Sequence, residues 1–188
     1  MQISDFLQEN GEIQDRWIDR ALATYPEGGV AALKAQKDRF ANPIGYNIRH
    51  ALTSLYKHFC GTVELEQALV ALEDLIRIRA VQEFSPADAV SFLFLLKNAV
   101  KEENSTKKTA AEALGLAEWL AFEQRIDEIA LRTFDMYMDS RERVFKVRVN
   151  ELRRGTDNVV CPSALMRRED NKQTTVEPIN IHSSHEAR

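Results

Sequence analysis

Residues that interrupt helices are scarce in this chain. Average usage predicts about 13 glycines and 9 prolines at this length, whereas the 188 residues include 7 glycines and 5 prolines. No proline occurs between Pro86 and Pro162. Because glycine and proline are the least favourable residues inside a helix, their scarcity favours long helices. The composition therefore predicts an all-α protein.

Cysteine and basic charge are also in short supply. Cys60 and Cys161 are too few for a disulfide framework and lack the spacing of a structural zinc site, so we expect free thiols. Lysine and arginine number 25 against 29 acidic residues, a formal net charge of -4 at pH 7. Nucleic-acid binding requires a face rich in Lys and Arg, so this balance predicts no nucleic-acid partner.

No long apolar run is present. The longest stretch, Phe92 to Leu96 with Ala89 and Val90 before it, is far shorter than the roughly 18 to 20 residues that span a bilayer. The N-terminus carries Asp5 where a secretory signal has basic residues followed by an apolar run. We therefore expect a cytoplasmic protein without direct membrane insertion.

Apolar residues recur at three- and four-residue steps through most of the chain, which is the spacing of amphipathic helices. Asn42-Pro43 and Ser85-Pro86 each combine an N-cap residue with a first-turn proline and predict two helix starts. Gly61 predicts a helix stop. We predict a bundle of about six helices. They span about 4–24, 30–40, 43–60, 64–83, 86–103 and 110–154.

The sixth predicted helix is unusually long. Thr109 to Glu112 fits a capping box, and an unbroken helix from 110 to 154 would measure roughly 68 Å. The preceding residues form a body only about 40 Å across, so the helix must break or extend beyond it. Gly115 and Asp139-Ser140 are the candidate break points. If neither break occurs, the protruding end requires a partner for its apolar residues. We expect partial protrusion and a homodimer through this last helix.

The end of the chain differs in composition from the rest. All 15 aromatic residues lie at or before Phe145. The 34 residues after Arg154 show no periodic apolar pattern, which is typical of a disordered segment. We predict a helical domain over 1–154 and a disordered polar tail over 155–188.

Residue patterns typical of catalysis or cofactor binding are absent from the sequence. At 100° per residue, His50 lies about 150° from the apolar stripe of its helix and His58 about 70°, at the margin. His182 and His185 lie in the predicted tail. The chain has neither a glycine-rich phosphate loop nor a GxSxG nucleophile motif. We therefore expect no enzyme activity, no metal and no cofactor.

Two arginines fall within the apolar stripe of the sixth helix. By the same angular count, Arg141 and Arg148 share this stripe with the apolar residues Ile126, Ala130, Phe134, Tyr137, Val144 and Leu152. One interpretation is structural, because bases near a helix C-terminus complement its dipole and arginine stems cover apolar surface. The other is that both arginines lie at an interface and pair with acids of a second subunit or with an anionic ligand.

Three separated stretches together resemble one protein family. They are DRFANPIG from Asp38, IRIRAVQEFSP from Ile76, and FDMYM from Phe134 followed by RER from Arg141. In this order they are similar to the RsbRD N-terminal domain family, over essentially Phe6 to Arg154. The resemblance implies an all-helical input module named after stressosome proteins that act as co-antagonists of the RsbT kinase. Related input domains resemble globins without haem, so a globin-like bundle is one expectation.

The sequence departs from the proteins that give this family its name. They carry a C-terminal STAS domain of about 100 residues, whereas 34 residues follow the predicted sixth helix here. Kinase antagonism is therefore not carried over. The resemblance implies a stand-alone sensory or adaptor domain.

The residues of these stretches have a structural and a functional interpretation. Asn42 is a helix cap, and Arg77 and Arg79 can form ion pairs with Glu73 and Glu83 along their helix. Alternatively, several polar residues line one cleft, with Gly45 allowing close approach. The candidate ligand- or partner-binding residues are Arg39, Asn42, Arg77, Arg79, Gln82, Tyr137, Arg141 and Arg148.

We predict a non-catalytic regulatory or adaptor domain that dimerises through its last helix and binds a protein partner. The alternative is a sensor that binds a small molecule, haem or another ligand, between its helices.

Overall fold

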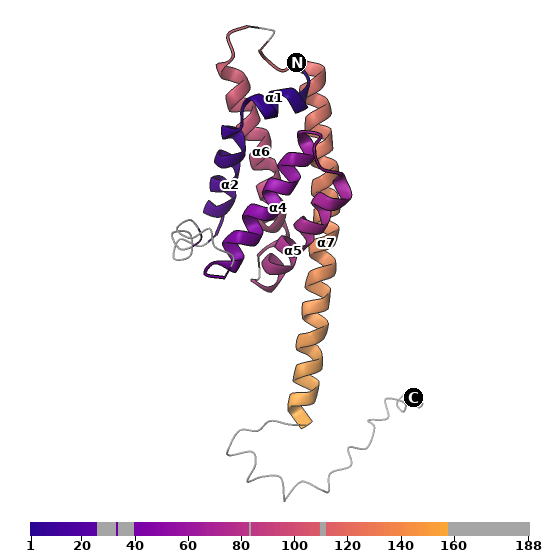
Figure 1. Cartoon of the computed structure of the whole chain (residues 1–188). Helices are drawn as coiled ribbons and strands as arrows, with labels where there is room; N and C mark the ends of the chain where they lie inside the picture. Colours follow the sequence, from indigo (N-terminus) through magenta and orange to yellow (C-terminus); the bar gives the residue numbers. More distant parts are fainter. Residues whose placement is uncertain (26–32, 34–39, 83, 110–111, 158–188) are drawn as a thin grey trace, which may run out of the picture. The chain divides into compact units, whose positions relative to one another are not determined.

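The computed structural model describes residues 1–25, 33, 40–82, 84–109 and 112–157. These residues form six helices and no strand, which confirms the predicted all-α fold (Figure 1). The chain divides into two compact units, Met1–Lys146 and Val147–Arg188. The helices are α1 (Ile3–Glu9), α2 (Glu12–Ala23), α4 (Pro43–Phe59), α5 (Leu65–Val81), α6 (Pro86–Thr106) and α7 (Leu116–Asp157).

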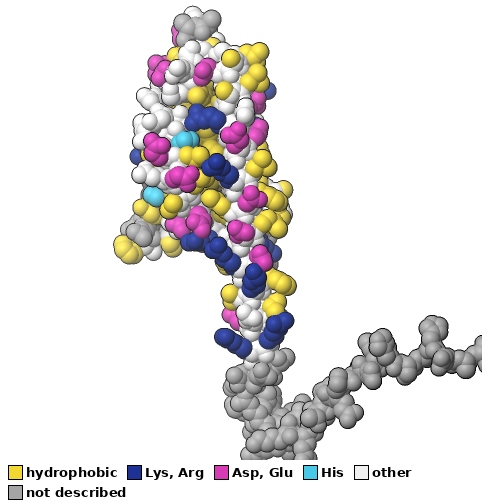
Figure 2. Space-filling view, turned by 90° about the vertical axis from the view of Figure 1, so that its right-hand side faces the viewer, with side chains coloured by type: hydrophobic (Ala, Val, Ile, Leu, Met, Phe, Trp, Pro, Cys, Tyr) yellow, Lys and Arg dark blue, Asp and Glu magenta, His cyan; other side chains and the backbone are white. Residues whose placement is uncertain are grey.

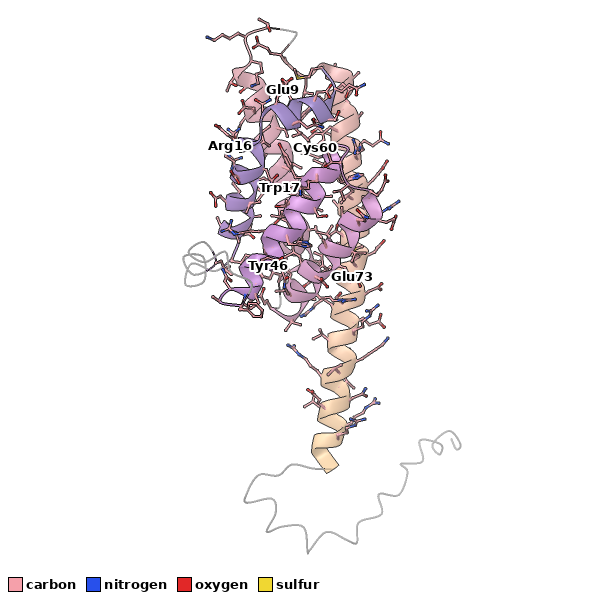
Figure 3. The ribbon with its side chains drawn as sticks, viewed as in Figure 1. Glu9, Arg16, Trp17, Tyr46, Cys60 and Glu73 are labelled. Atoms are coloured by element: carbon pink, nitrogen blue, oxygen red, sulfur yellow. The ribbon has the colours of Figure 1, made fainter. Side chains whose placement is uncertain are left out.

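The first unit is a helical bundle around one apolar core. Helix α4 packs along α5, and α2 packs along both α6 and α4. Trp17 of α2 is fully buried within the bundle, and its indole N–H donates to the Phe92 carbonyl of α6 at 2.6 Å (Figure 3). The Phe122 ring of α7 meets the Phe59 ring of α4 edge-on, with centroids 5.3 Å apart. Residues of every helix therefore contribute to a single core.

Both predicted helix starts with a first-turn proline are confirmed. The Asn42 side chain accepts from the Gly45 N–H at 2.9 Å, and the Ser85 hydroxyl accepts from the Asp88 N–H at 3.1 Å. A Cβ at Gly45 would lie 2.3 Å from Nδ2 of Asn42. The close approach expected at Gly45 is therefore the approach of its own N-cap side chain.

The N-terminal segment differs from the prediction of one helix over 4–24. It forms two helices, because α1 ends at Glu9 and α2 begins at Glu12. The Asn10 side chain donates to the Phe6 carbonyl at 2.7 Å, and Gly11 follows it. Asparagine and glycine both favour helix ends, and here they outweigh a continuous apolar spacing.

The last helix starts later than predicted. No helix begins at Thr109, whose carbonyl accepts from the N–H groups of Glu112 and Ala113, each at 3.2 Å. Helix α7 begins at Leu116, directly after Gly115, so the capping box was wrong. Gly115, the first candidate break point, precedes the helix and does not divide it. Asp139-Ser140 does not interrupt α7, and Ser140 is buried.

Some predictions concern residues outside the described part of the chain. These are most of the short helix at 30–40, the tail from 158 onward, Cys161, His182 and His185. Within the described part, no helix combines the length and apolarity that crossing a membrane requires.

Candidate functional site

A buried arginine joins three helices at one end of the bundle. Arg79 of α5 has no solvent exposure (0%). Its Nε–H donates to the Tyr25 hydroxyl at 3.3 Å, and Nη2 donates to the Thr24 hydroxyl at 3.0 Å. Nη1 donates to the carbonyls of Asp88 at 3.0 Å and Ala89 at 3.2 Å. Arg79 thus connects the end of α2 to the first turn of α6.

Aromatic rings surround the same guanidinium. The Arg79 Cζ atom lies 5.0 Å from the ring centroid of Tyr25, 4.9 Å from that of Phe84 and 4.7 Å from that of Phe92. The four hydrogen-bond acceptors are hydroxyl and carbonyl oxygens, all uncharged. Burial lowers the pKa of Arg79 and raises the pKa of Tyr25. Cation–π attraction is strongest where the cation is desolvated, so these rings help to hold the charge.

Helix α7 is attached to the adjacent α5–α6 connection. The Tyr137 hydroxyl donates to the Phe84 carbonyl, and Arg141 Nη1 donates to the Ala80 carbonyl at 3.0 Å. Ala80 lies in the last turn of α5, where carbonyls lack helical partners, so Arg141 caps α5. Burial raises the pKa of the Tyr137 hydroxyl. We call Arg79, Phe84, Tyr137 and Arg141 the α5–α6 corner.

The other candidate residues lie elsewhere. Arg77 is exposed, and its Nη2 lies 2.6 Å from Oε1 of Glu73, one turn earlier on α5; this ion pair was predicted. Gln82 is exposed at the end of α5. Asn42 is a buried cap that also donates to the Leu33 carbonyl. Since Arg77 points into solvent and Arg79 into the core, the two do not share a cleft.

Two candidate residues, Arg148 and Arg39, remain to be placed. Arg148 is exposed and belongs to the second unit. Arg39 and Glu83, the expected partner of Arg79, lie outside the described residues.

The predicted histidine positions are confirmed. His50 is exposed, and His58 lies at the margin of the core, where Nδ1 is 3.1 Å from the Val63 carbonyl and Nε2 is 3.3 Å from Arg125 Nη2. Among the described residues, no group of three or more His, Cys, Asp or Glu side chains is placed to hold a metal ion.

A second apolar stripe runs along α7 within the first unit. Its six exposed residues fall within an arc about 60° wide, about 120° around the helix from the buried face. In the view of Figure 2, hydrophobic side chains gather along one edge of the molecule. We call this set the α7 stripe: Leu116, Leu120, Leu131, Phe134, Met138 and Phe145.

The sequence prediction merged the two stripes of α7. Phe134 was grouped with the core residues Ile126 and Tyr137, but it is 40% exposed whereas Ile126 and Tyr137 are buried. The spacing of three, four and seven residues that joins Leu131, Phe134, Met138 and Phe145 is the signal that could have separated the two stripes.

Comparison with known proteins decides the family. Residues 11–152 match the model of the RsbT co-antagonist protein rsbRD N-terminal domain. The chain belongs to the RsbRD N-terminal domain family. This membership confirms the resemblance of the three sequence stretches and identifies the chain as a stressosome-type signalling input domain.

A relative of this RsbRD N-terminal domain is an uncharacterised protein of Archaeoglobus fulgidus. It is 29% identical over 141 residues, which cover 74% of this chain and 82% of the relative. No solved structure matches the chain significantly. Both the α5–α6 corner and the α7 stripe lie within the residues that match the family.

Proposed function

We propose that this RsbRD N-terminal domain is a non-catalytic, cytoplasmic regulatory domain that acts through protein contacts and forms a homodimer through α7. The family supports a role in signalling. The exposed α7 stripe supports the dimer, because contiguous apolar surface is typical of interaction sites.

The stripe has the spacing of a helix-pairing surface. Leu131, Phe134, Met138 and Phe145 follow one another at steps of three, four and seven residues, the spacing with which one helix packs against another. The side of α7 about 120° away from the stripe is already occupied, because Phe122, Ile126 and Tyr137 belong to the core. A second copy is the simplest occupant, since one self-complementary surface serves both subunits of a two-fold dimer.

Light scattering of the full chain tests the dimer. We expect a mass of twice the 21.5 kDa of one chain. The double substitution Phe134→Glu with Met138→Glu should give monomers, because it places four charges in the interface of the dimer. Val70→Glu, at an exposed apolar position on α5, is the matched control and should leave the dimer intact. A wild-type chain that remains monomeric at high concentration would contradict the proposal.

A further inference from the structure

The charges on α7 indicate how two copies pair. Resting on the proposed homodimer, we infer that the two α7 helices run antiparallel with the two-fold axis close to Phe134, so that Asp127 of each copy faces Arg141 of the other. The occupant of the α7 stripe is thus a second copy in one stated orientation.

The two charged residues are placed symmetrically around Phe134. Asp127 precedes Phe134 by seven residues and Arg141 follows it by seven. Seven residues are nearly two helical turns, so all three lie on nearly the same side of α7. An axis at Phe134 therefore brings Asp127 opposite Arg141 in two equivalent places and brings Leu131 near Met138.

A parallel arrangement opposes like charges instead. In register, it would place Asp127 against Asp127 and Arg141 against Arg141 of the two copies, along the apolar stripe. Like charges that face each other across an interface are costly, and the cost rises as water is removed. The antiparallel arrangement replaces both repulsive contacts with attractive ones.

Both side chains are available for this contact. Lys97 of α6 binds Oδ1 of Asp127 at 2.7 Å, but the Asp127 side chain remains 54% exposed. Arg141 is half-buried and uses Nη1 to cap α5. A guanidinium has five N–H donors, so Arg141 can keep this cap and still donate to a carboxylate of a second copy.

The distribution of charged residues along α7 favours the same antiparallel orientation. Within the first unit, residues 116–135 of α7 carry five acidic and two basic side chains, whereas residues 136–146 carry two acidic and three basic ones. Antiparallel pairing places the acidic half of each helix beside the basic half of the other. Such complementarity favours one orientation even where the apolar contacts would permit both.

Distances between spin labels determine the orientation. Labels are attached to Gln124→Cys or Asp135→Cys in the full chain, with Cys60→Ala and Cys161→Ser removing the native thiols. Antiparallel pairing separates the two copies of position 124 by 20 residues along the axis, about 30 Å, but brings the two copies of position 135 within one turn. We expect a long distance for the first variant and a short one for the second.

The outcomes separate the inference from the proposed function. Short distances for both labels would show a parallel dimer and overturn the orientation, while the homodimer stands. A monomer without dipolar coupling at position 135 would overturn both. Light scattering on the labelled variants confirms which species is measured.

A charge reversal gives an independent readout. Arg141→Glu places two carboxylates together in the antiparallel dimer, so the dissociation constant should rise about tenfold or more. Arg143→Glu, an exposed position about 160° around α7 from Phe145, is the control and should change it little. Because Arg141 also caps α5, thermal melting checks that the variant is folded. A folded Arg141→Glu variant that dimerises like the wild type would overturn the inference.

Discussion

Arg79 offers a sharp test of how the bundle holds a buried charge. We compare Arg79→Met, which removes the charge and keeps an unbranched apolar stem, with Arg79→Lys, which keeps the charge. We expect the conservative Lys variant to be the less stable of the two. The reason lies in the uncharged oxygens and the three rings that surround the guanidinium.

The expected loss of stability in Arg79→Met follows from the hydrogen-bond partners that lose the guanidinium. The Asp88 and Ala89 carbonyls belong to α6 and accept its own N–H groups, so they stay satisfied. The Thr24 hydroxyl keeps its bond to the Ala21 carbonyl. The buried Tyr25 hydroxyl loses the Arg79 donor. One such loss, offset by relief of a buried charge, predicts a decrease of about 1–3 kcal/mol in the free energy of unfolding.

The expected loss of stability is larger in Arg79→Lys because the positive charge stays buried. An ammonium has three donors on one nitrogen, so it cannot reach the α2 hydroxyls and the α6 carbonyls together, and it is more strongly hydrated than guanidinium. Losing at least one charged hydrogen bond, each worth about 1.5–3 kcal/mol, adds to the desolvation cost. We therefore expect a decrease of about 3–5 kcal/mol.

Urea unfolding followed by circular dichroism measures both variants. The deficit of the Lys variant should shrink as the pH rises, because a buried ammonium has a lowered pKa and can lose its proton, whereas a methionine cannot. An Arg79→Lys chain that is more stable than Arg79→Met, or as stable as the wild type, would refute the reasoning.

Two further predictions concern the first unit. Gly45→Ala should lower the melting temperature, because its Cβ would lie 2.3 Å from the capping carboxamide, whereas Gly11→Ala, with open space around its Cβ, should not. Hydrogen bonds from Lys107 and Arg16 lower the pKa of Glu103, so this carboxylate adds stability above its unfolded pKa that is lost as the pH falls through its folded pKa. In Glu103→Gln, the free energy of unfolding should therefore fall less than in the wild type as the pH is lowered. An equal fall in the variant and the wild type would contradict this role of Glu103.

Local features of the fold were predictable from the sequence. The caps at Asn42 and Ser85 were correct because an N-cap bonds to backbone two or three residues away. The Arg77–Glu73 pair was correct because side chains four apart meet on any helix. The break at Asn10-Gly11 was local too, and the apolar periodicity concealed it.

The candidate site depends on contacts between residues far apart in the chain. Arg79 was expected to pair along its own helix, but it bonds to residues 54 and 55 positions away. A clue was present, because Arg79 follows Leu72, Leu75 and Ile76 at steps that put it on the apolar face of α5. Nothing in that spacing identifies the aromatic rings and hydroxyl groups that contact the Arg79 guanidinium.

The sequence by itself determined the helical class, most helix boundaries and the family, because helix periodicity, caps and motifs are encoded over a few residues. Only the tertiary structure decided which apolar face of α7 enters the core and which remains exposed, since both faces have helical spacing. It also decided that Arg79 is buried while Arg77 is in solvent. Burial depends on where neighbouring helices pack, and that packing is set by the whole core at once.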